Sequence, residues 1–148
     1  MIFIPNIQKP YSFSQSAFGK ENHPDNDWCT LAMGDSLFHA ILDFYEWSIT
    51  PRGGGKPIEI SLNDMSLPFG GLFDGVNANW QVPHITHRIG RSVDINNTIV
   101  PFQIYDPHNP NKPIVTKAGK ELQRLMNLHL GFRIIDGKSV HYEFYSAN

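Results

Sequence analysis

The sequence contains very little cysteine and no long hydrophobic run. Cys29 is the only cysteine among 148 residues, which excludes an intramolecular disulfide framework and a cluster of thiolate ligands. No stretch reaches the roughly 20 apolar residues that cross a bilayer, and the first residues, MIFIP, lack the length and basic start of a signal peptide. We therefore expect no membrane insertion, and any metal site must use histidine and carboxylate side chains.

Positive charge is also scarce. The formal net charge is -2 and no run of Lys or Arg occurs, so the electrostatic footprint of a nucleic-acid-binding protein is missing. The composition, with 41% hydrophobic and 18% charged residues, is that of a globular protein and argues against disorder or a coiled coil. A chain of this length buries a core without help from a structural metal, so a metal bound here is expected to be functional.

The N-terminal part and the remainder differ in pattern. Residues 1–28 are polar and interrupted by prolines without a sustained period, which predicts an extended arm that wraps the domain or hangs from it. Residues 29–148 are expected to form a single domain. From Thr30 to Trp47, apolar residues recur at spacings of three and four, which predicts a helix.

Further elements follow along the chain. Residues 57–62 and 92–96 alternate as strands do, and residues 101–113 form a Pro- and Asn-rich excursion. Thr116 is a plausible N-cap for a second helix that ends at Gly131. A C-terminal hairpin is predicted from 132–135 and 138–145 around an Asp136-Gly137 turn.

The most informative segment is PHITHRIGRSVDI, residues 83–95, which is rich in histidine and β-branched residues. Proline, β-branched residues and Gly90 disfavour a helix here and favour extended structure with a bend. A turn at Gly90 brings the side chains of His87 and Asp94 together. Imidazole nitrogen and carboxylate oxygen are suitable zinc donors, and a catalytic zinc needs three protein ligands.

The third donor must come from elsewhere in the chain. His141 stands out because it lies between Val140 and Tyr142 in a patterned strand, where a side chain is held rigidly. The other histidines have simpler explanations. His23 and His108 lie in Pro- and Asn-rich stretches, His39 is expected at the surface or core edge, and His129 is placed to interact with the C-terminal end of a helix dipole.

Residues 87–95, HRIGRSVDI, resemble the His-x-x-Gly-x-(Ala/Ser)-x-Asp signature of the LAS zinc metallopeptidases. This group includes D-alanyl-D-alanine carboxypeptidases and dipeptidases, penicillin-insensitive murein endopeptidases and the zinc-bearing hedgehog domain. His84 is similar to an extra active-site histidine of the murein endopeptidases, and Asp64-Met65-Ser66-Leu67-Pro68 with Gly70-Gly71 is similar to the segment before their zinc motif. The resemblance spans residues 57–145.

The resemblance implies an α+β fold, in which a small central antiparallel sheet holds the zinc ligands and about two main helices pack against it. It implies one Zn²⁺ per chain, bound by His87, Asp94 and His141. The implied activity is hydrolysis of peptide bonds in peptidoglycan stem peptides, of the murein endopeptidase or D,D-carboxypeptidase type. A protein with this substrate is expected in the periplasm, in the cell wall or outside the cell.

Proton transfer requires a further side chain. We rank His84 and Asp136, which is similar in position to a catalytic side chain of the murein endopeptidases, above Glu143. Each has a structural alternative: His84 as a hydrogen-bonded residue that shapes its loop or supports a ligand, and Asp136 as half of a tight Asp-Gly turn.

Several residues are candidates for substrate binding. Arg88, with Arg91, is suited to steering an anionic substrate because guanidinium binds carboxylates well; the alternative is a solvated arginine on a turn. Asp64 and Ser66 are candidates for lining a substrate groove, although both are also ordinary turn formers.

The sequence departs from the family near the last ligand. The family usually has His-x-His or Glu-x-x-His there, whereas Lys138 and Ser139 occupy those positions here. This departure supports an alternative function, a non-catalytic zinc-binding domain that binds a protein or cell-wall partner. A small binding module with an incidental histidine cluster is a third possibility.

Overall fold

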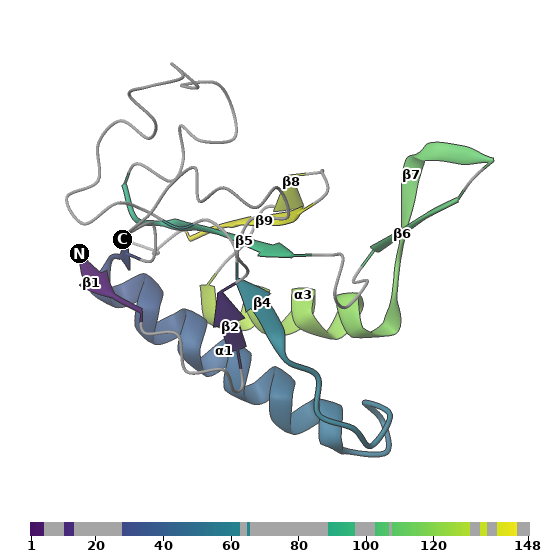
Figure 1. Cartoon of the computed structure of the whole chain (residues 1–148), viewed down its shortest axis with the longest axis horizontal. Coiled ribbons are helices and arrows are strands. Elements are labelled where there is room, and N and C mark those ends of the chain that lie inside the picture. The colour runs from purple at the N-terminus through teal and green to yellow at the C-terminus, as the bar shows by residue number, and fades with distance from the viewer. Residues whose placement is uncertain are drawn as a thin grey trace.

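The computed structural model describes residues 1–4, 11–13, 28–62, 65, 89–96, 103–106, 108–130, 134–135 and 139–144. A five-stranded sheet and two helices form the centre of this described part (Figure 1). The strands follow the order β2 (Tyr11–Phe13), β4 (Ile60–Leu62), β5 (Ser92–Asn96), β9 (Ser139–Glu143) and β8 (Ile134–Ile135). β2 is parallel to β4, and the other neighbouring pairs are antiparallel. The predicted α+β fold is therefore confirmed.

The first predicted helix is present as α1 (Leu31–Ile49). Thr30 caps it, because its hydroxyl accepts a hydrogen bond from the Met33 backbone N–H at 3.3 Å. At the other end the chain turns away at Thr50, whose backbone N–H binds the Trp47 carbonyl. Leu37 and Ile41 of the apolar stripe seen in the sequence are buried, whereas its members Leu31 and Phe38 are exposed. Met33, Ala40 and Phe44 complete the buried face.

The second predicted helix is α3 (Lys117–Leu130). The expected cap is confirmed, since the Thr116 hydroxyl accepts a hydrogen bond from the Gly119 backbone N–H at 3.0 Å. Leu122, Leu125 and Met126 are buried on one face, as their spacing predicts. Gly131, the expected C-terminal cap, lies outside the described residues.

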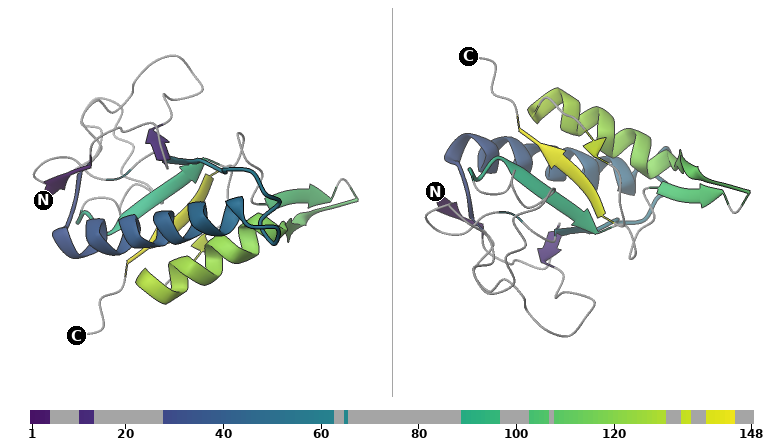
Figure 2. Two further views of the ribbon diagram at one scale, coloured as in Figure 1. Left: turned by 90° about the horizontal axis from the view of Figure 1, so that it is seen from below. Right: turned by 90° about the horizontal axis from the view of Figure 1, so that it is seen from above.

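Both helices cover the same face of the sheet (Figure 2). Side chains from α1, α3 and the strands form one apolar core between them, with Phe44, Leu122, Ile60, Val93 and Tyr142 among its members. Because successive side chains of a strand point to opposite faces, the alternate residues of β4, β5 and β9 lie on the face away from the helices. No helix in the described part of the chain is long and apolar enough to cross a membrane.

The two helices also meet through histidines. His129 Nε2 lies 2.7 Å from Asp43 Oδ2, and its ring stacks on that of His39 with centroids 6.1 Å apart. His39 is exposed, which confirms its expected surface position. His129, placed from the sequence at a helix dipole, has a carboxylate partner on the neighbouring helix.

Residues 101–113 did not show a strand pattern, but most of this region is a β-hairpin. β6 (Gln103–Asp106) pairs with β7 (Asn109–Val115) in a separate antiparallel ribbon, which projects from the end of α3 (Figure 1). A two-stranded ribbon has a free edge on each strand, so a proline N–H is not required for a neighbouring strand. This explains how Pro113 is accommodated opposite Tyr105.

The described parts of the N-terminal arm pair with the domain. β1 (Ile2–Phe3) is antiparallel to β3 (Trp28–Cys29), and β2 is an edge strand of the main sheet. Tyr11 of β2 is 3% exposed and belongs to the core. These short segments carry no local periodicity, which is why the sequence did not indicate their pairing.

The C-terminal strands are antiparallel as predicted, but their register differs from a two-residue hairpin. Ile135 pairs with His141, whereas a tight turn at Asp136-Gly137 would pair Ile135 with Lys138. The tight-turn register is therefore wrong. Asp136 and Gly137 themselves lie outside the described residues.

Candidate metal centre

Two of the three predicted zinc ligands face each other at the middle of the sheet. Asp94 is the central residue of β5, His141 is the central residue of β9, and the antiparallel register pairs them directly. His141 Nδ1 lies 2.6 Å from Asp94 Oδ1. The fold thus brings together two residues that are 47 positions apart in the sequence.

The neighbouring residues show to which face of the sheet the two side chains point. Val93 and Tyr142 are fully buried in the core on the helix side, so Asp94 and His141 point to the opposite face. We call this opposite face, with Ser61, Ser92, Asp94, Asn96 and His141, the polar face. Asp94 is 7% exposed and His141 is 3% exposed, so the pair is held away from bulk water.

The contact between the two side chains is a charge-assisted hydrogen bond when Nδ1 of a neutral His141 is protonated, because that N–H then donates to the carboxylate. Burial of a carboxylate is costly without such a partner. The same interaction fixes the ring orientation of the imidazole. Asp94 and His141 therefore position each other before any ligand arrives.

The donor set of this pair suits zinc. Two donor atoms of a tetrahedral zinc site lie about 3.3 Å apart, since each metal–ligand bond is about 2.0–2.1 Å. Nδ1 and Oδ1 are closer than this in the present hydrogen bond. A zinc ion bound by both atoms would replace the shared proton. The two atoms would then have to move apart by less than about 1 Å.

A third ligand is needed for a stable site. Within the described ranges no three His, Cys, Asp or Glu side chains form a metal-binding group. His87, the remaining predicted ligand, lies outside those ranges. So do the predicted catalytic and substrate-binding residues His84, Arg88, Asp64, Ser66 and Asp136.

Cys29 offers no alternative donor. Its side chain is fully buried, and this burial raises the pKa of the thiol to about 12. The thiolate, which is the form that binds metals, is therefore disfavoured at neutral pH. The expectation that histidine and carboxylate residues must supply the ligands is consistent with this protonation state.

The predicted bend at Gly90 is confirmed. Gly90 has φ of 66°, in the left-handed region that favours glycine. Its carbonyl accepts a hydrogen bond from the Thr30 backbone N–H at 2.9 Å, and a Cβ added at Gly90 would overlap the Met1 sulfur. The turn before β5 is thus braced by the start of α1 and by the N-terminal residue.

Arg91 joins the ends of the two central strands. Its Nε donates a hydrogen bond to the Phe144 carbonyl at 3.0 Å, its own carbonyl accepts from the Phe144 N–H at 2.6 Å, and its guanidinium lies 5.6 Å from the centre of the Phe144 ring. Phe144 belongs to the core on the helix side. Arg91 is therefore engaged on the face opposite Asp94, and we assign it to strand alignment rather than to substrate steering.

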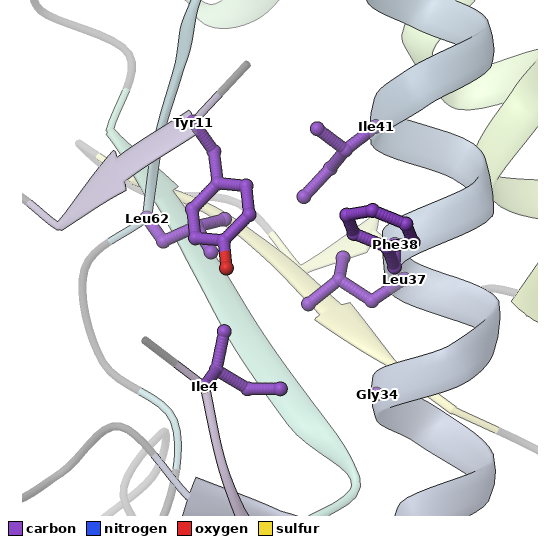
Figure 3. Close-up of a pocket in the computed structure, with 7 residues that line it drawn as sticks. All are labelled: Ile4, Tyr11, Gly34, Leu37, Phe38, Ile41 and Leu62. Atoms are coloured by element: carbon purple, nitrogen blue, oxygen red, sulfur yellow. The ribbon is translucent and has the colours of Figure 1, made fainter. Parts of the chain in front are cut away.

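A small pocket lies on the helix side of the sheet, away from the polar face (Figure 3). Its volume of about 30 Å³ is small, and its lining is apolar. It therefore suits neither a peptide nor a metal ion. The lining residues are Ile4, Tyr11, Gly34, Leu37, Phe38, Ile41 and Leu62.

Comparison with known proteins adds no assignment. No family model, curated protein or solved structure matches the chain.

The sequence reasoning missed one polar residue on the same face. Ser61 alternates with Ile60 and Leu62 in β4, and this alternation alone would have placed it opposite the core. The zinc motif does not point to it, because serine is not a metal ligand in that motif. The pairing of Asp94 with His141 could not have been read from local spacing, because it depends on the register between distant strands.

Proposed function

We propose that this chain is a zinc-dependent peptidase that hydrolyses peptide bonds in peptidoglycan stem peptides. Its single zinc ion would be held by His87, Asp94 and His141. The main support is the 2.6 Å contact between Asp94 and His141. These two residues were selected as ligands from the sequence, independently of their positions in space, and a chance pairing at the centre of a sheet would be unusual.

The placement of the pair on two adjacent strands also supports the proposal. A bound zinc ion supplies a Lewis acid and lowers the pKa of its water ligand. The residues of the chain provide the rest. Asp94 and His141 are fixed by adjacent strands, and Gly90 turns the chain into β5.

The remaining roles are assigned to residues outside the described ranges. His84 and Asp136 are the proposed proton carriers. Arg88 is the proposed partner of a substrate carboxylate, because a guanidinium group binds carboxylates in a bidentate manner. Asp64 and Ser66 are proposed to line the substrate groove. The protein would act where its substrate lies, in the periplasm, in the cell wall or outside the cell.

A second candidate function is a non-catalytic zinc domain of the same fold that binds a protein or cell-wall partner. Two observations favour it. The family's usual histidine or glutamate near the last ligand is replaced around Ser139. In addition, the exposed fractions of Asp94 and His141 are low, and closed sites are typical of structural zinc, whereas catalytic zinc keeps a position open to water.

Incubation of the zinc-loaded protein with purified sacculi separates these two functions. A peptidase should release fragments with new peptide termini, which mass spectrometry identifies together with the bond that was cut. The metal-free protein and the Asp94→Ala variant serve as controls and should release none. Co-sedimentation with sacculi without any new terminus would support the non-catalytic domain and refute the peptidase.

A further inference from the structure

Ser61 lies on the polar face of the sheet, beside the proposed metal ligands. Its neighbours Ile60 and Leu62 are fully buried in the core, and alternate side chains of a strand point to opposite faces. The hydroxyl of Ser61 is therefore directed away from the helices. It shares this face with Asp94 and His141.

The strand register gives the approximate distance between Ser61 and Asp94. Leu62 pairs with Ile95 in the antiparallel pair of β4 and β5, which places Ser61 across from Asn96, two positions after Asp94. Diagonal neighbours on one face of such a pair are about 7–8 Å apart. Because an extended peptide advances roughly 3.3 Å per residue, this separation corresponds to about two residues of a bound peptide.

The hydroxyl of Ser61 has no hydrogen-bond partner among the described residues, although the residue is only 4% exposed. An unsatisfied buried hydroxyl is unfavourable and is rare in folded proteins. The backbone of β4 is flanked by β2 on one side and by β5 on the other. The side-chain hydroxyl is thus the group of Ser61 that remains for a ligand.

A second buried serine provides the contrast. Ser48, in α1, is fully buried, and its hydroxyl donates to the Tyr45 carbonyl at 2.6 Å and accepts from the Ile58 N–H at 3.0 Å. The hydrogen-bonding capacity of Ser48 is therefore used by the fold itself. That of Ser61 is not.

We infer that Ser61 is a substrate-binding residue whose hydroxyl hydrogen-bonds to a backbone amide group of the stem peptide, about two residues from the bond held at Asp94 and His141. The inference rests on the proposed peptidase function. The strand register places Ser61, Asp94 and His141 on one face of the sheet, so a peptide held at the pair also lies beside Ser61. The unsatisfied hydroxyl gains its partner in the complex.

Two matched substitutions test this role. Ser61→Ala and Ser48→Ala each remove one hydroxyl from a buried serine. Isothermal titration of the zinc-loaded full chain with a synthetic stem peptide ending in D-alanyl-D-alanine gives the affinity, and thermal unfolding without peptide gives Tm. Ser61→Ala should weaken peptide binding about fivefold while zinc content stays the same and Tm stays the same or rises. Ser48→Ala should lower Tm and leave the peptide affinity unchanged.

The outcomes separate this inference from the proposed function. Wild-type affinity in Ser61→Ala would overturn the role of Ser61 alone. A fall in Tm comparable to that of Ser48→Ala would do the same, because it would show that the Ser61 hydroxyl serves the fold. Absence of peptide binding by the zinc-loaded wild type would overturn the inference together with the proposed activity on this substrate.

Discussion

Gly90 determines how the chain enters the strand that holds Asp94. Its positive φ and the distance of 3.1 Å that would separate an added Cβ from the Thr30 backbone nitrogen are two separate reasons why no larger residue is favoured there. The sequence predicted the turn, because glycine between β-branched residues indicates a bend. It could not predict that Thr30 and Met1 would brace it, since those residues are distant in the chain.

Gly90→Ala should destabilise the protein by more than the backbone strain alone, which costs about 1–2 kcal/mol for a residue in the left-handed region. Gly55 is a matched control, because it has φ of 73° and no atom lies within 4 Å of an added Cβ. Gly55→Ala should lower the free energy of unfolding only by the cost of the backbone strain. Urea unfolding of both variants measures the difference, and equal losses would contradict the proposed bracing of the turn by the Thr30 backbone.

At the scale of elements, the antiparallel ladder between β5 and β9 creates the candidate site. The pairs from Ser92 with Glu143 to Asn96 with Ser139 include Asp94 with His141 at the centre. A shift of one residue would turn one of the two side chains to the core. Whatever fixes this register therefore also fixes the placement of Asp94 and His141, the proposed metal ligands.

Arg91 is the residue that we expect to hold this register at one end. Arg91→Met removes both the hydrogen bond to the Phe144 carbonyl and the charge over its ring, and should cost about 1–2 kcal/mol of unfolding free energy. It should also weaken zinc binding, because Asp94 and His141 lose their alignment. Urea unfolding and a zinc competition titration measure the two effects.

The matched control is Arg124→Met. Arg124 is an exposed arginine that pairs with Glu121 within α3, and exposed pairs of this kind contribute less than about 1 kcal/mol. This variant should retain the zinc affinity of the wild type. If Arg91→Met were as stable and bound zinc as tightly as Arg124→Met, Arg91 would have no role in aligning the strands.

The elements that the sequence predicted are those with strong local patterns. The helices α1 and α3 and the strands β4, β5 and β9 each show apolar residues at the appropriate period. The ribbon of β6 and β7 was not predicted, because its prolines suggested irregular structure. The pairing of β2 with β4 was not predicted either, because a three-residue strand from the N-terminal arm has no local signal.

At the scale of the whole molecule, the sheet separates two environments. The helices and the apolar core occupy one face, and the other face holds four of the buried polar residues, Ser61, Ser92, Asp94 and His141. This division explains why the small apolar pocket is not the site. It also explains why the orientation of Asp94 and His141 could be predicted partly from sequence, since polar residues within apolar strands indicate the face opposite the core.

The central claim is that Asp94 and His141 bind zinc together with His87. The most direct measurement is the zinc content of the purified wild type and of single alanine variants at these three positions, by elemental analysis after dialysis. His39→Ala is the control, because His39 is an exposed histidine on α1. The wild type and the control should contain close to one zinc per chain, and each ligand variant should lose it. Unchanged zinc content in Asp94→Ala and His141→Ala would contradict the claim.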